Sequence, residues 1–146
     1  MSTPRRPGPS DPPPYAGSRL GLPADGPGSV AGWGRRLSAL TIDWLAASLV
    51  VIAFVGVEQW SNSGTASALT LGVFWLEATL LTALMGGSFG QLITRVRVTR
   101  LDGRPLDLLR AAGRTLLICL VIPPLVFNPE QRGLHDLATD AVALKL

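Results

Sequence analysis

The sequence predicts an all-α membrane protein: a helical hairpin, a third transmembrane helix that is kinked or re-entrant, and a short β-like cytoplasmic loop. Three observations lead to this fold class. Hydrophobic residues make up 47% of the 146 residues, and the mean hydropathy is +0.35. Charged residues make up only 16%, against about 25% in soluble domains. Two apolar runs are each long enough to cross a bilayer.

Residues 1–32 form a proline-rich segment before the first apolar run, and residues 33–146 form the predicted membrane domain. Eight of the twelve prolines lie in the first segment, where glycine and serine fill much of the rest. Such a composition offers too little apolar surface to offset the entropy of ordering, so we expect a disordered cytoplasmic tail. Residues 12–15, Pro-Pro-Pro-Tyr, could bind a cytoplasmic partner as a polyproline II ligand. A tail that only solubilises is the other interpretation.

The two apolar runs predict a hairpin that spans the lipid bilayer. The first run, 37–57, has about 21 residues and would be about 31 Å long as a helix, which covers the hydrocarbon core. The second run, 66–85, is of similar length, and a short turn at 61–64 separates the two. Arginines lie before the first run and after the second, the pattern of cytoplasmic flanks. We therefore expect the turn outside and the N-terminus in the cytoplasm.

Residues 86–110 are predicted to form the main cytoplasmic connection. The glycine-rich stretch 86–90 is interpreted as a tight turn, because the Lys-Ser/Thr of a phosphate-binding loop does not follow it. From Ile93 to Leu101, residues alternate with the period of two that is typical of a strand. Asp102-Gly103 is then a turn signal. We expect a short strand or hairpin at the membrane surface, with its arginines near anionic lipid headgroups.

The third segment, 108–127, leaves two alternatives open. Its uninterrupted apolar part, 115–127, has about 13 residues, which is short for a span. Arg110 and Arg114 lie in its first half, and Pro123-Pro124 interrupts its second half, where proline breaks or kinks a helix. The segment is either a kinked span or a re-entrant element, and the side on which the C-terminus lies depends on the answer.

Two acids lie inside the predicted spans. An ionised carboxylate at the centre of a transmembrane helix costs on the order of 2.5–3.5 kcal/mol on insertion scales. Asp43 should therefore face the protein interior and find a partner on another helix. Arg36 lies two turns earlier on the same face, too far for a direct bridge, so Arg114 is the best candidate. Asp43 either marks a ligand or ion pathway or belongs to a structural ion pair. No partner for Glu77 is evident.

Several classes of function find no support in the sequence. No Cys or His cluster accompanies the single His135, so neither a metal nor a cofactor is predicted. The single Cys119 lies in an apolar run, where it acts as a small hydrophobe. A His-Asp pair without a positioned nucleophile is weak evidence for a hydrolase, so we expect no enzyme. The arginines flank membrane spans and belong to no nucleic-acid module, so nucleic acid is not an expected partner.

Three stretches, in this order, resemble the RDD family of small bacterial membrane proteins. The first, 36–43, opens a helix with an arginine and reaches an aspartate. The second, 86–91, is rich in glycine and precedes the β-like stretch. The third, 132–136, reads Arg-Gly-Leu-His-Asp. The resemblance covers about residues 33–143, and departs from the family at 138–142. It implies the following signature residues and candidate pathway residues: Arg36, Asp43, Arg114, His135 and Asp136.

The resemblance also implies a multi-pass protein of the bacterial plasma membrane. A role in transport of an unidentified ligand is proposed for the family, and here an intramembrane aspartate, Asp43, would serve a ligand or an ion. Three helices are too few to enclose a pathway, so we expect a homo-oligomer. The alternative is a structural or accessory membrane protein, in which the polar network fixes helix packing and the proline-rich tail recruits a partner.

Overall fold

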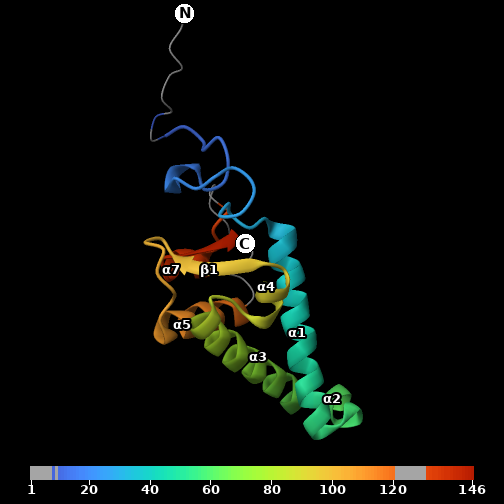
Figure 1. Cartoon of the computed structure of the whole chain (residues 1–146). Coiled ribbons are helices and arrows are strands. Elements are labelled where there is room, and N and C mark those ends of the chain that lie inside the picture. The colour runs from blue at the N-terminus through green and yellow to red at the C-terminus, as the bar shows by residue number, and fades with distance from the viewer. Residues whose placement is uncertain (1–7, 9, 121–130) are drawn as a thin grey trace, which may run out of the picture.

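The computed structural model describes residues 8, 10–120 and 131–146. Figure 1 shows two long helices that meet at a short helix, α2, and separate toward the other end of the molecule. The sheet and the remaining short helices lie at that other end. In chain order the elements are η1 (Ser18–Leu20), α1 (Trp33–Val55), α2 (Val57–Asn62), α3 (Gly64–Met85), α4 (Phe89–Ile93), β1 (Val96–Arg100), α5 (Leu108–Cys119), α7 (Leu134–Ala138) and β2 (Ala141–Lys145).

Helices α1 and α3 form the hairpin that the sequence predicts. They are 23 and 22 residues long, with mean hydropathies of 2.0 and 1.7, so both are long and apolar enough to cross a membrane. Helix α1 ends before Gly56, whose φ of 86° is a conformation that favours glycine. The chain then continues as α2, so the connection is partly helical and longer than the turn expected at 61–64.

Apart from Val51 and Phe74, the two long helices bury small or polar side chains, and they expose many large apolar ones. Leu49, Phe54 and Leu84 are 67%, 87% and 80% exposed. In water such side chains would be buried, whereas in lipid small residues let helix backbones approach and large ones face the acyl chains. This pattern is the one expected of helices that pack in lipid. The buried positions are Ala39, Asp43, Ala47, Ser48 and Val51 on α1 and Ala66, Thr70, Phe74, Ala78, Thr79 and Thr82 on α3.

The β-like segment is a strand, but its partner is distant in sequence. Strand β1 pairs with β2 in antiparallel register, with Val98 opposite Ala143. Val96 and Val98 are buried whereas Arg97 between them is exposed, as the two faces of a strand require. Gly103 closes a turn after β1 through its N–H bond to the carbonyl of Arg100, but no local hairpin follows among the described residues. The prediction of an all-α fold is therefore corrected to a mostly helical fold with a small sheet.

Residues 28–31, which the sequence analysis placed in the tail, pair with the other edge of β2. The N–H of Ala31 donates to the carbonyl of Ala143, and the N–H of Lys145 donates to the carbonyl of Ser29, both at 2.8 Å. Ser29, Val30 and Ala31 are buried. The packed part of the chain thus begins a few residues before the predicted boundary at 33. Composition gave no sign of this pairing, because a strand edge is recognised through backbone groups that every residue carries.

Helix α5 occupies the first part of the predicted third span. Its 12 residues give about 18 Å of helix, less than the hydrocarbon core requires. It packs against α3 on one side and α7 on the other. Residues 121–127, which include Pro123-Pro124, lie outside the described residues, so a kinked or re-entrant third span stays a prediction.

Candidate functional site

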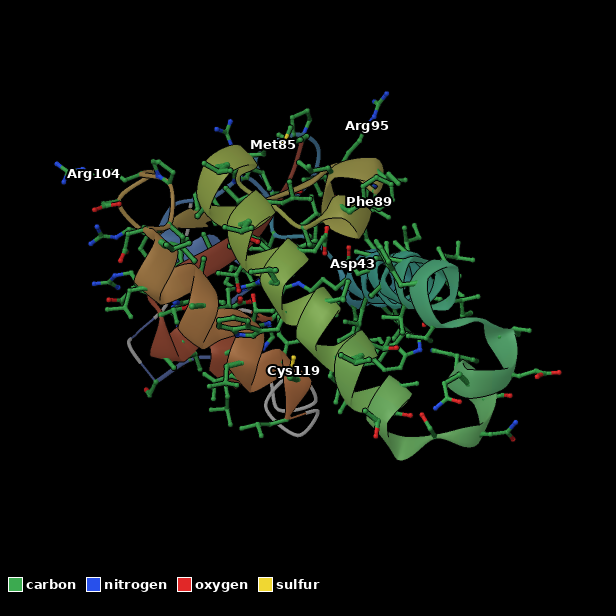
Figure 2. All side chains as sticks on the ribbon, turned by 90° about the horizontal axis from the view of Figure 1, so that it is seen from below. Asp43, Met85, Phe89, Arg95, Arg104 and Cys119 are labelled. Atoms are coloured by element: carbon green, nitrogen blue, oxygen red, sulfur yellow. The ribbon has the colours of Figure 1, made fainter. Side chains whose placement is uncertain are left out.

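Asp43 lies on the buried face of α1, and Figure 2 shows it beside the segment that carries Phe89. Ser88 Oγ donates to Asp43 Oδ2, and the N–H of Gly90 donates to Asp43 Oδ1, both at 2.5 Å. Both carboxylate oxygens are therefore bonded to the glycine-rich connection. The expected pairing of Asp43 with Arg114 is wrong. Arg114 binds Asp136 instead, and both oxygens of Asp43 accept from residues at the start of α4.

The glycine-rich connection is more than the tight turn that the sequence analysis expected, since it leads directly into helix α4. Ser88 and Gln91 form a capping box: the N–H of Gln91 donates to Ser88 Oγ, and the N–H of Ser88 donates to Gln91 Oε1. Serine followed three residues later by glutamine is a known signature of a helix start, so this sequence signal was available. From α3, Glu77 Oε1 also bonds this first turn, because it accepts a hydrogen bond from the N–H of Phe89 at 2.8 Å. Carboxylates from both long helices thus hold the first turn of α4.

Gly90 is the point at which α4 touches α1. A Cβ at this position would lie 2.0 Å from the backbone oxygen of Ala39, so only glycine fits. The close approach is what brings the N–H of Gly90 to Asp43. The glycine therefore serves the packing of the site rather than the flexibility of a loop.

A second polar cluster joins the start of α1 to α5 and α7. Asp136 Oδ2 accepts from Arg36 Nη1 at 2.7 Å, and Asp136 Oδ1 accepts from Arg114 Nε at 2.9 Å. His135 Nε2 lies 3.3 Å from Asp136 Oδ1. Arg132 connects this cluster to the sheet, because its Nε donates to the carbonyl of Ala141 at 2.9 Å. The structure thus brings together four of the five predicted site residues.

Asp136 is fully buried and stays ionised through its neighbours. Burial alone would raise the pKa of this carboxyl, but the charges of Arg114, His135 and Arg36 outweigh burial and lower the pKa to about 2. One carboxylate therefore serves two guanidinium groups. Removing one partner of a buried ion pair costs about 3–5 kcal/mol, because it leaves an uncompensated charge in a poorly solvated place.

A cavity of about 270 Å³ lies where the two polar clusters meet. Arg36, Asp43, Arg114 and His135 all line it, whereas Asp136 does not belong to the lining. Most of the remaining wall is apolar, so the cavity has a charged part and an apolar part. The other lining residues are Trp33, Leu37, Leu40, Phe74, Ala78, Thr82, Ser88, Gln91, Thr115 and Ile118.

Two hydrogen-bond donors of this lining, Arg36 Nη2 and Thr82 Oγ1, are buried without a partner among the described residues. A buried donor left unpaired costs about 1–3 kcal/mol, so such groups in native proteins usually meet water or a ligand. The sequence analysis did not single out Thr82. Its place on the buried face of α3, with residues 66, 70, 74 and 78, emerges only from the structure, because apolar residues surround this helix on all sides.

The chemistry of the lining favours binding a hydrogen-bond acceptor. Arg36 Nη2 can only donate and the Thr82 hydroxyl is free to donate, whereas the oxygens of Asp43 already accept two bonds. Within the described ranges, no group of three or more His, Cys, Asp or Glu side chains is placed to hold a metal ion. The arrangement therefore suits non-covalent recognition of a molecule that carries an acceptor group.

Comparison with protein-family models gives a match to the RDD family over residues 30–140. No curated protein and no solved structure matches the chain. The matched range contains the hairpin, the capped start of α4, strand β1 and the cluster around Asp136. It covers well over half of the sequence, and its helices are long and apolar enough to span a bilayer. The chain therefore belongs to the RDD family of membrane proteins.

Proposed function

We propose that this protein takes part in the transport of a small ligand or ion across the bacterial plasma membrane, with the cavity beside Asp43 as part of the pathway. The observation that carries the proposal is the meeting of Arg36, Asp43, Arg114 and His135 at one cavity, which both long helices help to line. Polar and ionisable groups inside a membrane protein usually face a cavity of this kind, and mark a path for substrates or ions.

The distribution of charge supports an orientation with the N-terminus in the cytoplasm. The cavity lies at the end of the hairpin where α1 begins and α3 ends. Figure 2 shows Arg95 and Arg104 extending outward from the body of the molecule, and both belong to the connection that follows α3. Under the positive-inside rule this end faces the cytoplasm, where the arginines would lie near anionic lipid headgroups.

Two copies or more would be needed for a complete pathway. Among the described residues only α1 and α3 are long enough to span, and two helices cannot surround a polar path in lipid. We therefore include a homo-oligomer in the proposal. Catalysis and nucleic-acid binding are not part of it, since the polar groups of the site hold one another or point into a mostly apolar cavity.

Proton flux in proteoliposomes tests the transport proposal. With the pH dye pyranine inside and a Na⁺ or K⁺ gradient imposed, we expect a pH change with the wild-type protein and only background with Asp43→Asn. Asparagine keeps the shape of the side chain but removes the charge that faces the cavity. Glu58→Gln is the matched control, because Glu58 is an exposed acid on α2, and it should retain the wild-type flux.

The outcomes separate two functions. Equal flux from Asp43→Asn and wild type, at equal thermal stability, would remove Asp43 from the mechanism. No flux from the wild type with either cation would contradict ion coupling through Asp43 and would favour the second candidate, a structural or accessory membrane protein. A specific observation favours that candidate: all four carboxylate oxygens of Asp43 and Asp136 are bonded within the chain.

Two N-terminal deletions test the accessory role of the tail. Removing residues 2–25 should leave thermal stability unchanged, because the strand pairing at 28–31 remains. Removing residues 2–31 should lower the free energy of unfolding by about 2–4 kcal/mol, since backbone hydrogen bonds to β2 are lost and each contributes about 1 kcal/mol. If the tail recruits a partner, the shorter deletion abolishes crosslinking to it in native membranes. Unchanged crosslinking would contradict an adaptor role.

A further inference from the structure

We infer that the cavity binds an anionic amphiphile from the adjoining membrane leaflet, a molecule with a carboxylate or phosphate head and a single apolar chain. The inference goes beyond the transport proposal, because such a molecule would occupy the cavity whether or not anything crosses the membrane. It rests on the unused donors of the lining, on the apolar wall opposite them and on where the cavity meets lipid.

The head of the ligand is specified by the donors that remain unused. Arg36 donates through Nη1 to Asp136 and through Nε to the carbonyl of Ala31, so Nη2 is the part of its guanidinium left for a ligand. The hydroxyl of Thr82 is the second buried donor of the lining. A charged oxygen makes the strongest hydrogen bonds to a guanidinium.

The chain of the ligand is specified by the remaining wall. Leu40 of α1, Phe74 of α3 and Ile118 of α5 line the cavity from three helices. An apolar cavity of about 150 Å³ is large enough to bind benzene, and this one measures about 270 Å³. It therefore has room for several carbons of an apolar chain. A free inorganic anion would meet the donors but would leave this wall unfilled.

The cavity is lined at one side by residues that face outward from the hairpin. Trp33 and Leu37, both in the first turns of α1, line it and are 43% and 46% exposed. Tryptophan is enriched where a membrane protein meets the lipid headgroups. A ligand therefore reaches the cavity sideways from the leaflet, with its head at the depth of Arg36.

Native mass spectrometry of the full chain from a neutral detergent tests the ligand class, because each bound molecule adds its own mass. The probes are laurate, dodecyl phosphate, dodecanol and inorganic phosphate. We expect one molecule of laurate or dodecyl phosphate per chain, with dodecanol and inorganic phosphate binding at least about tenfold more weakly. Equal binding of dodecanol would overturn the role of the anionic head. Equal binding of inorganic phosphate would overturn the role of the chain.

Two matched pairs of variants locate the binding. Ala78→Leu fills the cavity and should abolish dodecyl phosphate binding, whereas Ala68→Leu, at an exposed position of the same helix, should not. Thr82→Val should weaken binding about fivefold. Thr79→Val should leave it unchanged, because Thr79 has the same kind of buried hydroxyl but does not line the cavity.

The variants are compared at equal thermal stability in the same detergent. If Ala78→Leu does not fold, the Thr82 and Thr79 pair decides the question by itself. Equal affinities within that pair would overturn the proposed site for the head. Binding and flux are measured separately, so a protein that binds dodecyl phosphate but moves no ions supports this inference and contradicts only the transport proposal.

Discussion

Replacing Asp136 with asparagine is expected to lower the free energy of unfolding by about 3–5 kcal/mol. The carboxylate is fully buried and accepts from both Arg36 and Arg114. Asparagine offers one acceptor and no charge, so two guanidinium groups would lie in the interior without their counter-charge. Thermal and denaturant unfolding in detergent, followed by tryptophan fluorescence, measures the loss.

Asp140→Asn is the matched control. Asp140 makes an exposed ion pair with Arg110 at 3.5 Å, and pairs of this kind contribute about 0–1 kcal/mol. Similar losses from the two substitutions would contradict a special role for the buried cluster.

The dependence of stability on pH gives a second check of the Asp136 cluster. The pKa of Asp136 falls from 3.8 to about 2 on folding, so its contribution to stability is present above about pH 4 and is lost as the pH falls toward 2. Asp136→Asn should lack this part of the acid sensitivity.

Replacing Gly90 with alanine is expected to be similarly costly, at about 3–5 kcal/mol. The added Cβ would lie 2.0 Å from the backbone oxygen of Ala39, and overpacking of this kind costs about 1–3 kcal/mol. Moving α4 away from α1 also breaks the bond from the N–H of Gly90 to Asp43, and hydrogen bonds to charged groups contribute about 1.5–3 kcal/mol. Hydrogen exchange at the amides of α4, together with unfolding, measures the effect.

Gly72→Ala shows whether the effect is specific to the contact. Gly72 lies within α3, and a Cβ there would meet nothing within 4 Å. Alanine has the higher helix propensity, so this substitution should be neutral or stabilise by up to about 1 kcal/mol. If Gly90→Ala were as stable as Gly72→Ala, α4 would not pack against α1 as described.

Much of the candidate site was predictable, although its internal contacts were not. Arg36, Asp43, Arg114, His135 and Asp136 were all singled out by sequence, and four of them line one cavity. The pairing was wrong for Asp43, because a charged residue in a helix shows that a partner is needed but not which one. The Arg36–Asp136 bond joins residues 100 positions apart, a distance over which no local pattern operates.

In the fold as well, the local sequence predicted strand β1 but not the strand with which it pairs. Its alternation of valine with arginine predicted a strand, because the two faces of a strand differ within a few residues. The choice of β2 as its partner depended on how α5 and α7 return the chain to the sheet. The pairing of residues 28–31 was hidden for a related reason, since it relies on backbone hydrogen bonds.

By itself, the sequence determined the hairpin, the family and the residue types of the site. The hairpin follows from the length and apolarity of two continuous runs, which are local properties that lipid selects directly. Only the tertiary structure decided that Asp43 holds the start of α4, that Asp136 holds two arginines, and that a partly apolar cavity lies where these clusters meet. Those contacts arise between segments far apart in the chain, and depend on how closely the helix backbones approach.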